Sequence, residues 1–172
     1  MTYRTNYDSP LGKVLLTADE AGLTGLCFYG EKYFPHDLYE GYIQEETEIL
    51  AESKKWLDEY FGGSEPNFTP PLHPAGSEFR HEVWDILLQI PYGKTTTYGE
   101  IAAVLAKRRG ILRMSAQAVG GAVGHNPVSI IIPCHRVVGH NGNLTGYAGG
   151  IDRKIKLLEI ERADVSDKLS LR

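Results

Sequence analysis

A proline-rich segment divides this chain of 172 residues into two parts. Residues 64–76, SEPNFTPPLHPAG, contain four prolines, and proline removes a backbone donor and disrupts a helix interior. We therefore expect an extended linker here. Because a chain of this length fits one large domain or two small ones, we predict an N-terminal domain over residues 1–75 and a C-terminal domain over residues 76–172.

The N-terminal part is predicted to form a small antiparallel sheet with one helix. The stretches TYRTNYD and KVLLTAD flank the turn SPLG, and GLTGLCFYG is the candidate for a third strand. Residues 45–61 carry apolar side chains at helical spacing, and Gly62 and Gly63 end that helix.

The C-terminal part is predicted to be mostly helical, which makes the whole chain α+β. Ser77 is a candidate N-cap, and Thr97 with Glu100 has the spacing of a capping box. The apolar run SIIIP, residues 129–133, is expected to be a buried strand. The predicted helices cover residues 77–90, 97–106, 115–124 and 152–163.

Charge is distributed unevenly along the chain. Residues 1–75 hold five Lys/Arg against thirteen Asp/Glu, a net charge of −8. Residues 91–136 hold six Lys/Arg against Glu100 alone, a net charge of +5. The basic region is either an ordinary solvated face or a binding surface for an anion such as nucleic acid.

The helix predicted over residues 115–124, SAQAVGGAVG, contains three glycines, and each interior glycine costs about 1 kcal/mol relative to alanine. Close helix–helix packing is one explanation. The other is DNA: a helix with ordinary side chains is about 10–12 Å across, whereas the minor groove is about 6 Å wide. Together with the helix at 97–106 and the basic loop between them, the sequence favours a DNA-binding helix-turn-helix.

The two cysteines have different surroundings. Cys27 lies in a predicted strand and is interpreted as a small buried apolar side chain. Cys134 lies between Pro133 and His135, and a neighbouring base or positive charge raises the reactive thiolate fraction. No Cys or His stands at ligand spacing from Cys134, so we expect no metal. Two cysteines make no disulfide framework and suggest a reducing, cytoplasmic compartment.

The string NPVSIIIPCHRVVG, followed by LTGYAGG and a helix ending near Glu161, closely resembles the O6-alkylguanine-DNA alkyltransferases, also called methylated-DNA–protein-cysteine methyltransferases. The resemblance is close over residues 77–162 and weaker over the N-terminal part. It implies a ribonuclease H-like N-terminal domain and a winged helix-turn-helix-like C-terminal domain. It also implies direct repair of double-stranded DNA, in which O6-alkylguanine is flipped out and its alkyl group moves irreversibly to a protein cysteine, once per molecule. O4-alkylthymine stays open as a second substrate.

The resemblance assigns the following roles. Cys134 is the alkyl acceptor, His135 is its base through a water, Glu161 orients His135, and Asn126 is the hinge between the recognition helix and the active-site strand. Arg136 is expected to form a structural salt bridge. The residues implied to contact the flipped base are Tyr98, Val137, Tyr147, Ala148 and Gly149.

DNA contacts through the minor groove are implied for the recognition helix and the basic loop. The family usually carries an arginine on this helix that enters the base stack, and the aligned residue here is Gln117. The loop before the helix is longer than usual, so its arginines could compensate. The candidate DNA-contacting residues are Thr95, Arg108, Arg109, Arg113, Ser115, Ala116, Gln117, Gly120 and Gly121.

Two other classes were weighed. A cysteine hydrolase is disfavoured because adjacent side chains on an extended segment point apart. A DNA-binding regulator or damage sensor is disfavoured because Cys134 is present. The chain has no apolar run long enough to span a membrane and no N-terminal apolar segment typical of a signal peptide. We expect a monomer without a cofactor or zinc.

Overall fold

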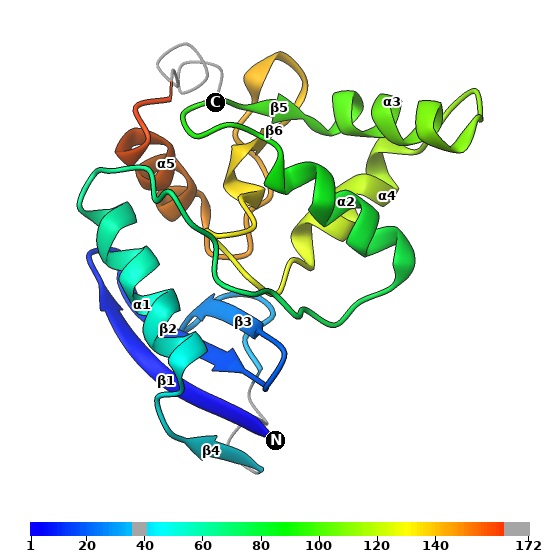
Figure 1. Cartoon of the computed structure of the whole chain (residues 1–172). Coiled ribbons are helices and arrows are strands. Elements are labelled where there is room, and N and C mark those ends of the chain that lie inside the picture. The colour runs from blue at the N-terminus through cyan, green and yellow to red at the C-terminus, as the bar shows by residue number, and fades with distance from the viewer. Residues whose placement is uncertain (36–40, 164–172) are drawn as a thin grey trace. The chain divides into compact units, whose positions relative to one another are not determined.

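The computed structural model describes residues 1–35 and 41–163, and its chain forms two compact units (Figure 1). The first unit comprises residues 1–75 together with residues 127–131, and the second comprises residues 76–126 and the chain from residue 132 onward. Strands dominate the first unit and helices the second, so the predicted α+β class is confirmed. No helix within the described ranges has the length and apolar character needed to cross a membrane.

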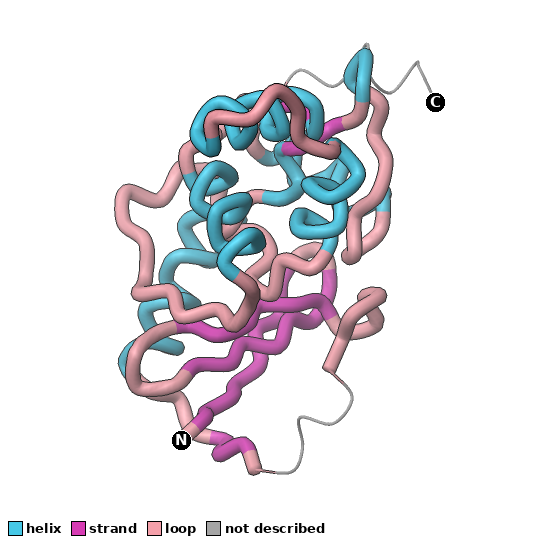
Figure 2. The backbone as a smooth tube through the Cα atoms, turned by 90° about the vertical axis from the view of Figure 1, so that its right-hand side faces the viewer, coloured by secondary structure: helices cyan, strands magenta, loops and turns pink. Residues whose placement is uncertain are grey.

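The first unit is built on a four-stranded sheet with the order β3-β2-β1-β4 (Figure 2). Strands β1 (Thr2–Ser9), β2 (Gly12–Ala18) and β3 (Leu23–Phe28) pair antiparallel, as the sequence predicted. The short strand β4 (Tyr42–Gln44) adds to β1 in parallel, so the sheet is mixed. Residues Val14 to Ala18 are all buried, and the one polar side chain among them, Thr17, shares a hydrogen bond with Thr24 (2.9 Å).

Helix α1 (Glu48–Phe61) packs against β1, β2 and β3. Thr47 caps its N-terminus by accepting a hydrogen bond from the Leu50 amide, and the chain leaves the helix at Gly62. Leu50, Leu57 and Tyr60 are fully buried on one stripe of the helix.

The proline-rich segment is extended, as predicted, but it is not a free linker. Leu23 of β3 donates its amide to the Pro71 carbonyl (2.7 Å) and accepts the His73 amide (2.8 Å). Further along β3, Leu26 pairs in the same way with Pro127 and Ser129 (both 2.9 Å). The outer edge of β3 is thus satisfied by two extended segments, which covers an otherwise exposed strand edge.

The described residues of the second unit form four α-helices and a short parallel pair of strands, β5 (Thr96–Thr97) and β6 (Val137–Val138). Ser77, Thr97 and Ser115 cap three of the helices through their hydroxyl groups. Of the predicted capping box, the bond from the Glu100 amide to the Thr97 hydroxyl forms (3.1 Å). The Glu100 carboxylate accepts instead from the Thr96 hydroxyl (2.6 Å). The helices are α2 (Glu78–Leu88), α3 (Tyr98–Arg109), α4 (Ala116–Gly124) and α5 (Ile151–Ile160).

Some predicted helix ends were wrong, and one predicted strand does not form. Helix α2 ends two residues before the predicted end, and α5 ends three residues before it. Helix α3 continues to Arg109, three residues beyond the prediction, because cations are favourable in a last helical turn and Gly110 supplies the left-handed conformation (φ 65°) that ends it. Residues 129–133 are buried but form turns, not a strand. Ile130 has φ +71°, which interrupts any extended run. A short apolar run indicates burial without determining backbone conformation.

Candidate active site and DNA-binding surface

Cys134 opens a short 3₁₀ helix, η1 (Cys134–Arg136), directly after Pro133. All three residues of η1 are buried, and Cys134 is 6% exposed. The sequence predicted Cys134 at the end of a strand, and that placement was wrong. The tight turn of η1 gives neighbouring side chains different directions from those on an extended segment, so Cys134 and His135 need not point to opposite faces.

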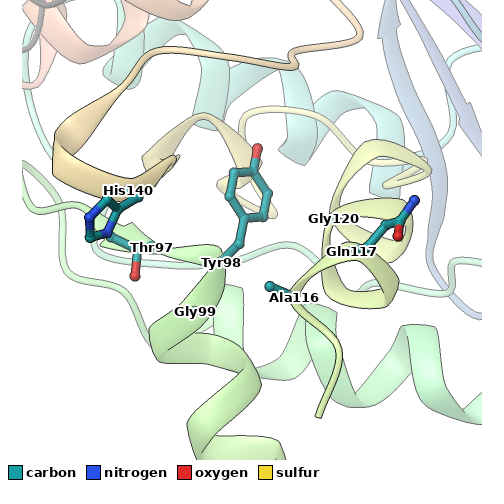
Figure 3. Close-up of a pocket in the computed structure, with 7 residues that line it drawn as sticks. All are labelled: Thr97, Tyr98, Gly99, Ala116, Gln117, Gly120 and His140. Atoms are coloured by element: carbon teal, nitrogen blue, oxygen red, sulfur yellow. The ribbon is translucent and has the colours of Figure 1, made fainter.

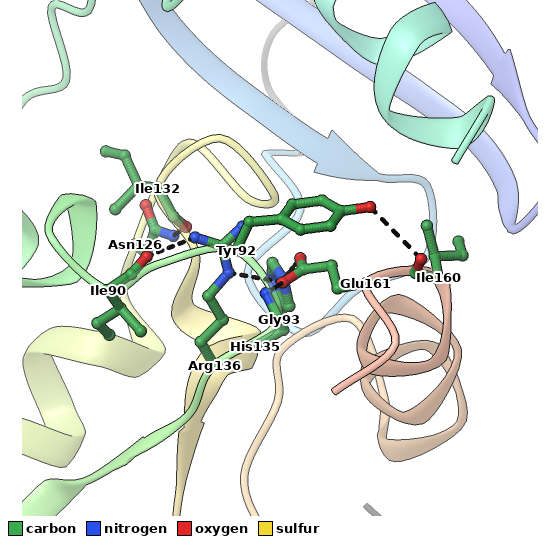
Figure 4. A network of polar contacts seen from close by, with 9 residues as sticks. All are labelled: Ile90, Tyr92, Gly93, Asn126, Ile132, His135, Arg136, Ile160 and Glu161. Carbon is green, nitrogen blue, oxygen red and sulfur yellow. Dashed lines mark hydrogen bonds and ion pairs between the residues drawn. The ribbon is translucent and has the colours of Figure 1, made fainter. Parts of the chain in front are cut away.

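Asn126 ties the end of α4 to the residue that leads into η1. Its side-chain amide donates to the Ile132 carbonyl (2.7 Å), and its backbone amide contacts the Val123 carbonyl of α4 (3.3 Å). Asn126 is itself 8% exposed, so this bond is shielded from water. The position predicted to be a hinge is therefore hydrogen-bonded on both sides, within the second unit (Figure 4).

A buried network follows Cys134 (Figure 4). His135 donates from Nε2 to Glu161 (2.5 Å), and Arg136 donates from Nε to the other carboxylate oxygen (2.8 Å). Glu161 is the C-cap of α5 and also accepts the Gly93 amide (3.1 Å). Arg136 further donates to the Ile90 carbonyl (2.7 Å). The predicted structural salt bridge of Arg136 is confirmed, and its partner is the same carboxylate that orients His135.

The charges of this network follow from burial and hydrogen bonding. Burial opposes ionisation of Glu161, but His135 and Arg136 together lower its pKa to about 2, so it is a carboxylate. Burial lowers the pKa of His135 and outweighs the opposing effect of Glu161, so the ring is neutral at pH 7. With its Nε2 hydrogen donated to Glu161, the neutral imidazole carries its lone pair on Nδ1.

Tyr98 is the first residue of α3, and its hydroxyl approaches the Thr145 carbonyl (3.5 Å). Burial, followed by the nearby Cys134, raises the pKa of Tyr98 to about 12, so the phenol keeps its proton. The loop that contains Thr145 continues into Tyr147, Ala148 and Gly149. The chain re-enters a helix at Gly150, whose φ of +94° favours glycine.

Lys154 is a buried residue of this region that the sequence reasoning missed. It is completely inaccessible, and its Nζ donates to the carbonyls of Val137 (2.6 Å) and Thr145 (2.9 Å). It thereby joins β6 to the loop that begins at Thr145, and the Val137 carbonyl predicted to meet a guanine already accepts this bond. A signal was present: Lys154 stands at helical spacing from Leu157, Leu158 and Glu161, which are all buried.

Replacing Lys154 with methionine is expected to change how stability depends on pH. Burial lowers the pKa of Lys154 to about 8, from an ordinary 10.5. Between these values the unfolded state binds a proton that the folded state has released. The free energy of unfolding of the wild type should therefore rise by about 3 kcal/mol relative to that of Lys154→Met as pH increases from 8 to 10.5. Urea unfolding of both proteins across this range measures the difference.

Lys156 provides the matched control, since it lies on the same helix and is exposed. Lys156→Met should change stability by less than about 0.5 kcal/mol. A constant difference between wild type and Lys154→Met across the same pH range would contradict the assignment of a lowered pKa to Lys154.

A separate pocket of about 610 Å³ opens between the start of α3 and the first turns of α4 (Figure 3). In the close-up, Tyr98 stands between Thr97 and His140 on one side and α4 on the other. Sequence reasoning did not single out His140, whose only signal was its place in a Gly/Asn turn. The lining residues are Thr97, Tyr98, Gly99, Ala116, Gln117, Gly120 and His140.

The small residues of α4 divide by face. Val119, Ala122 and Val123 are buried, and the Ala122 carbonyl accepts the Trp84 indole N–H of α2 (2.9 Å). A Cβ added at Gly121 or Gly124 would meet no atom of the described residues within 4 Å. Close helix–helix packing therefore does not explain these two glycines. They leave an outer helix face on which the backbone can be approached closely.

The remaining candidate DNA contacts are scattered. Ser115 is the N-cap of α4 (the Ala118 amide donates at 3.1 Å), and Arg113 is exposed in the preceding loop. Arg109 was expected in the basic loop but lies in α3, where it donates three hydrogen bonds to Glu82, two from one terminal nitrogen (both 3.0 Å) and one from Nε (3.2 Å). Its guanidinium also lies over the Phe79 ring. Thr95 and Arg108 line a different groove of about 330 Å³.

Comparison with protein families covers nearly the whole chain. Residues 2–74 match the model described as "6-O-methylguanine DNA methyltransferase, ribonuclease-like domain". Residues 78–163 match "6-O-methylguanine DNA methyltransferase, DNA binding domain". A methylated-DNA–protein-cysteine methyltransferase of Methanosarcina acetivorans is 42% identical over 160 residues, covering 92% of this chain and 97% of the relative. One of Mycobacterium leprae is 40% identical and covers 99% of both chains.

Solved structures agree. The O6-methylguanine methyltransferase of Mycobacterium tuberculosis superposes with a TM-score of 0.80 at 39% identity, over 99% of both chains. A structure of the Mycobacterium tuberculosis protein in complex with DNA gives a TM-score of 0.79 at 38% identity, again over 99% of both chains. On the family matches, the sequence identity and the shared fold, the chain is a member of the 6-O-methylguanine DNA methyltransferase family.

Proposed function

We propose that this protein repairs alkylated DNA by moving the alkyl group of O6-alkylguanine onto Cys134. The main support is a buried network in which His135 and Arg136, the two residues after the cysteine, both bond to Glu161. Membership of the family supplies the reaction class, DNA repair by alkyl transfer to a protein cysteine.

The reaction is a single displacement. Nδ1 of His135, acting through a water, takes the thiol proton of Cys134, and Glu161 stabilises the imidazolium that forms. The thiolate sulfur attacks the alkyl carbon, so a carbon–sulfur bond forms while the bond from that carbon to O6 breaks. The bonding pair leaves with O6, and the guanine takes up a proton at a ring nitrogen. The thioether product is stable, so each molecule reacts once.

Base positioning is assigned to the groups around the cysteine. Tyr98 keeps its proton because of its raised pKa and can donate a hydrogen bond to the leaving guanine. The site proposed to hold the flipped guanine is bounded by the residues Val137, Tyr147, Ala148 and Gly149. Lys154 donates to one lone pair of the Val137 carbonyl oxygen. An N–H group of guanine would therefore donate to the second lone pair.

Double-stranded DNA is the proposed partner, bound by a monomer through the minor groove. The proposal rests on the outer face of α4, where Gly121 and Gly124 open to space and Ala116 and Gln117 are exposed. Because a helix face with such small side chains is mostly backbone, it can approach the narrow minor groove. Asn126 then couples the end of α4 to the residues before Cys134.

Mass spectrometry tests the proposal. After mixing with a duplex that contains O6-methylguanine, the peptide with Cys134 should gain one methyl group, and the repaired strand should contain guanine. The amount of product should end at one methyl per protein molecule. Repeated turnover, as expected of a cysteine hydrolase, or an unmodified Cys134 despite tight DNA binding, would reject this function.

The rate of transfer should depend weakly on pH near neutrality. Burial lowers the pKa of His135 below its ordinary 6.5, so the neutral base persists as pH falls. The rate should therefore hold from about pH 8 to below 6.5 and decline only at lower pH, as the ring protonates. Stopped-flow measurement with a free O6-alkylguanine base keeps DNA binding out of the profile. A decline centred at 6.5 would contradict the neutral, buried state of His135.

A further inference from the structure

The loop between α3 and α4 exposes an apolar tip. Leu112 is 104% exposed, the highest value among the large apolar side chains of the described residues, and Ile111 is 46% exposed. A single exposed leucine is common on protein surfaces and carries no meaning by itself. Here, however, both ends of the loop are fixed by hydrogen bonds and the residues around the leucine are basic.

The first end is fixed by the way α3 stops. The Gly110 amide donates to the Lys107 carbonyl (3.2 Å), and the Ile111 amide donates to the Ala106 carbonyl (3.0 Å). Together with the left-handed Gly110 (φ 65°), this is the Schellman arrangement of a helix C-terminus. The direction in which the chain leaves α3 is therefore set immediately before Leu112.

The second end is fixed by Ser115, whose hydroxyl caps α4. Residues 111–114 lie between the caps Gly110 and Ser115, so the leucine sits on a short segment with anchored ends. Holding a side chain in one region of space before binding lowers the entropy cost of association. Leu112 is thus presented outward by the fold.

The charges around the tip indicate its partner. Lys107 and Arg113 flank Leu112 in sequence and are exposed, whereas Arg108 lines a separate groove and Arg109 pairs with Glu82. The cations complement the negative phosphate backbone of DNA. The apolar leucine complements the stacked bases that lie inside that backbone. The loop also leads directly into Ala116 and Gln117, which line the pocket of α4.

We propose that Leu112 is an apolar wedge that enters the minor groove beside the flipped base, while Arg113 contacts a flanking phosphate. Apolar side chains inserted between base steps unstack them and widen the groove. The wedge would assist Gln117, whose uncharged side chain offers less stacking surface than an arginine. This inference rests on the proposed function and adds a second DNA-contacting element to the same surface.

The test compares Leu112→Ala with Leu88→Ala, which removes the same atoms from another exposed leucine of the second unit (41% exposed, on α2). Leu112→Ala should weaken affinity for a duplex and slow transfer from it by about tenfold, the effect of losing most of the burial of one leucine side chain. Leu88→Ala should change neither. Fluorescence of 2-aminopurine beside the lesion should rise on binding of wild type and rise less with Leu112→Ala, because less unstacking occurs.

Salt dependence separates a wedge from a phosphate contact. Leu112→Ala should leave the slope of log K against log salt unchanged, since it removes no charge. Arg113→Gln should lower that slope by about 0.9, the value of one phosphate contact. Gln117→Arg, introduced into Leu112→Ala, should restore part of the lost rate.

A free O6-benzylguanine base distinguishes failure of this inference from failure of the proposed function. Alkylation of Cys134 by the free base needs no DNA, so Leu112→Ala should react with it at the wild-type rate. Failure of the wild type to take up a methyl group from the O6-methylguanine duplex would reject the proposed function. Equal duplex affinity and 2-aminopurine signal in Leu112→Ala and wild type would overturn the wedge, as would a change in self-association without a change in DNA binding.

Discussion

Replacing Cys134 with alanine is expected to abolish methyl incorporation completely while DNA affinity stays near that of the wild type. The reaction requires a sulfur nucleophile at this position, and an alanine methyl group has no lone pair to attack the alkyl carbon. Cys134 is small and 6% exposed, so its removal should lower stability by only about 1 kcal/mol. Transfer is measured by mass spectrometry and binding by fluorescence anisotropy on the same lesion-containing duplex.

Cys27 supplies the matched control. It is also a buried free cysteine, but burial, followed by the neighbouring Glu31, raises its pKa to about 12, so it stays a thiol. Cys27→Ala should therefore transfer at the wild-type rate. Methylation of Cys27, or of any other side chain in Cys134→Ala, would contradict the assignment of a single acceptor.

Glu161→Gln is expected to produce the largest loss of stability among single substitutions in the active site. The change removes the charge that compensates buried Arg136 and replaces one of the two acceptor oxygens, which hold His135 and Arg136, with an NH2 donor. Removing one partner of a buried ion pair costs about 3–5 kcal/mol, since the other charge stays buried. The rate of transfer should fall by about 10²–10⁴, the usual contribution of a positioned base. Urea unfolding and single-turnover kinetics at pH 7 measure the two effects.

The pair formed by Glu82 and Arg109 is the control for Glu161→Gln. It has the same chemistry but lies at the surface, with side chains 34% and 40% exposed, so Glu82→Gln should cost about 0–1 kcal/mol. The cost of Glu161→Gln should also depend on pH. The folded-state pKa of Glu161 is about 2 against an ordinary 4.5, so about 3 kcal/mol of its stabilisation is present above pH 4.5 and is lost as pH falls towards 2. Equal costs for the two variants at pH 7 would show that the buried network is not coupled to folding.

Much of the fold was predictable because its signals are local. Helical spacing of apolar residues, together with Ser77, Thr97 and Ser115 as caps, depends on neighbours within one or two turns. The three antiparallel strands were predictable for the same reason. The run SIIIP shows the limit: burial was predicted correctly, but Ile130 adopts a left-handed conformation that apolar character alone does not specify.

The candidate site was predictable only in part. Cys134, His135 and Glu161 were identified through family resemblance, because His135 and Glu161 lie 26 positions apart and no local rule joins them. Lys154 was missed because a lysine on an amphipathic helix is normally solvated, and only the facing carbonyls of Val137 and Thr145 make its burial acceptable. The ion pair of Arg109 with Glu82 of α2 was not predictable, because no local pattern places these two side chains together.

The sequence by itself determined the proline-rich division, the helices with their caps, the motif around Cys134 and the glycine-rich character of α4. The tertiary structure decided the state of each functional group: an ionised Glu161, a neutral His135, a protonated Tyr98, and glycines on α4 that open to space. The reason is physical. Helix periodicity and capping arise from contacts along the chain, whereas the charge of a buried group depends on desolvation and on partners that only folding brings within a few ångströms.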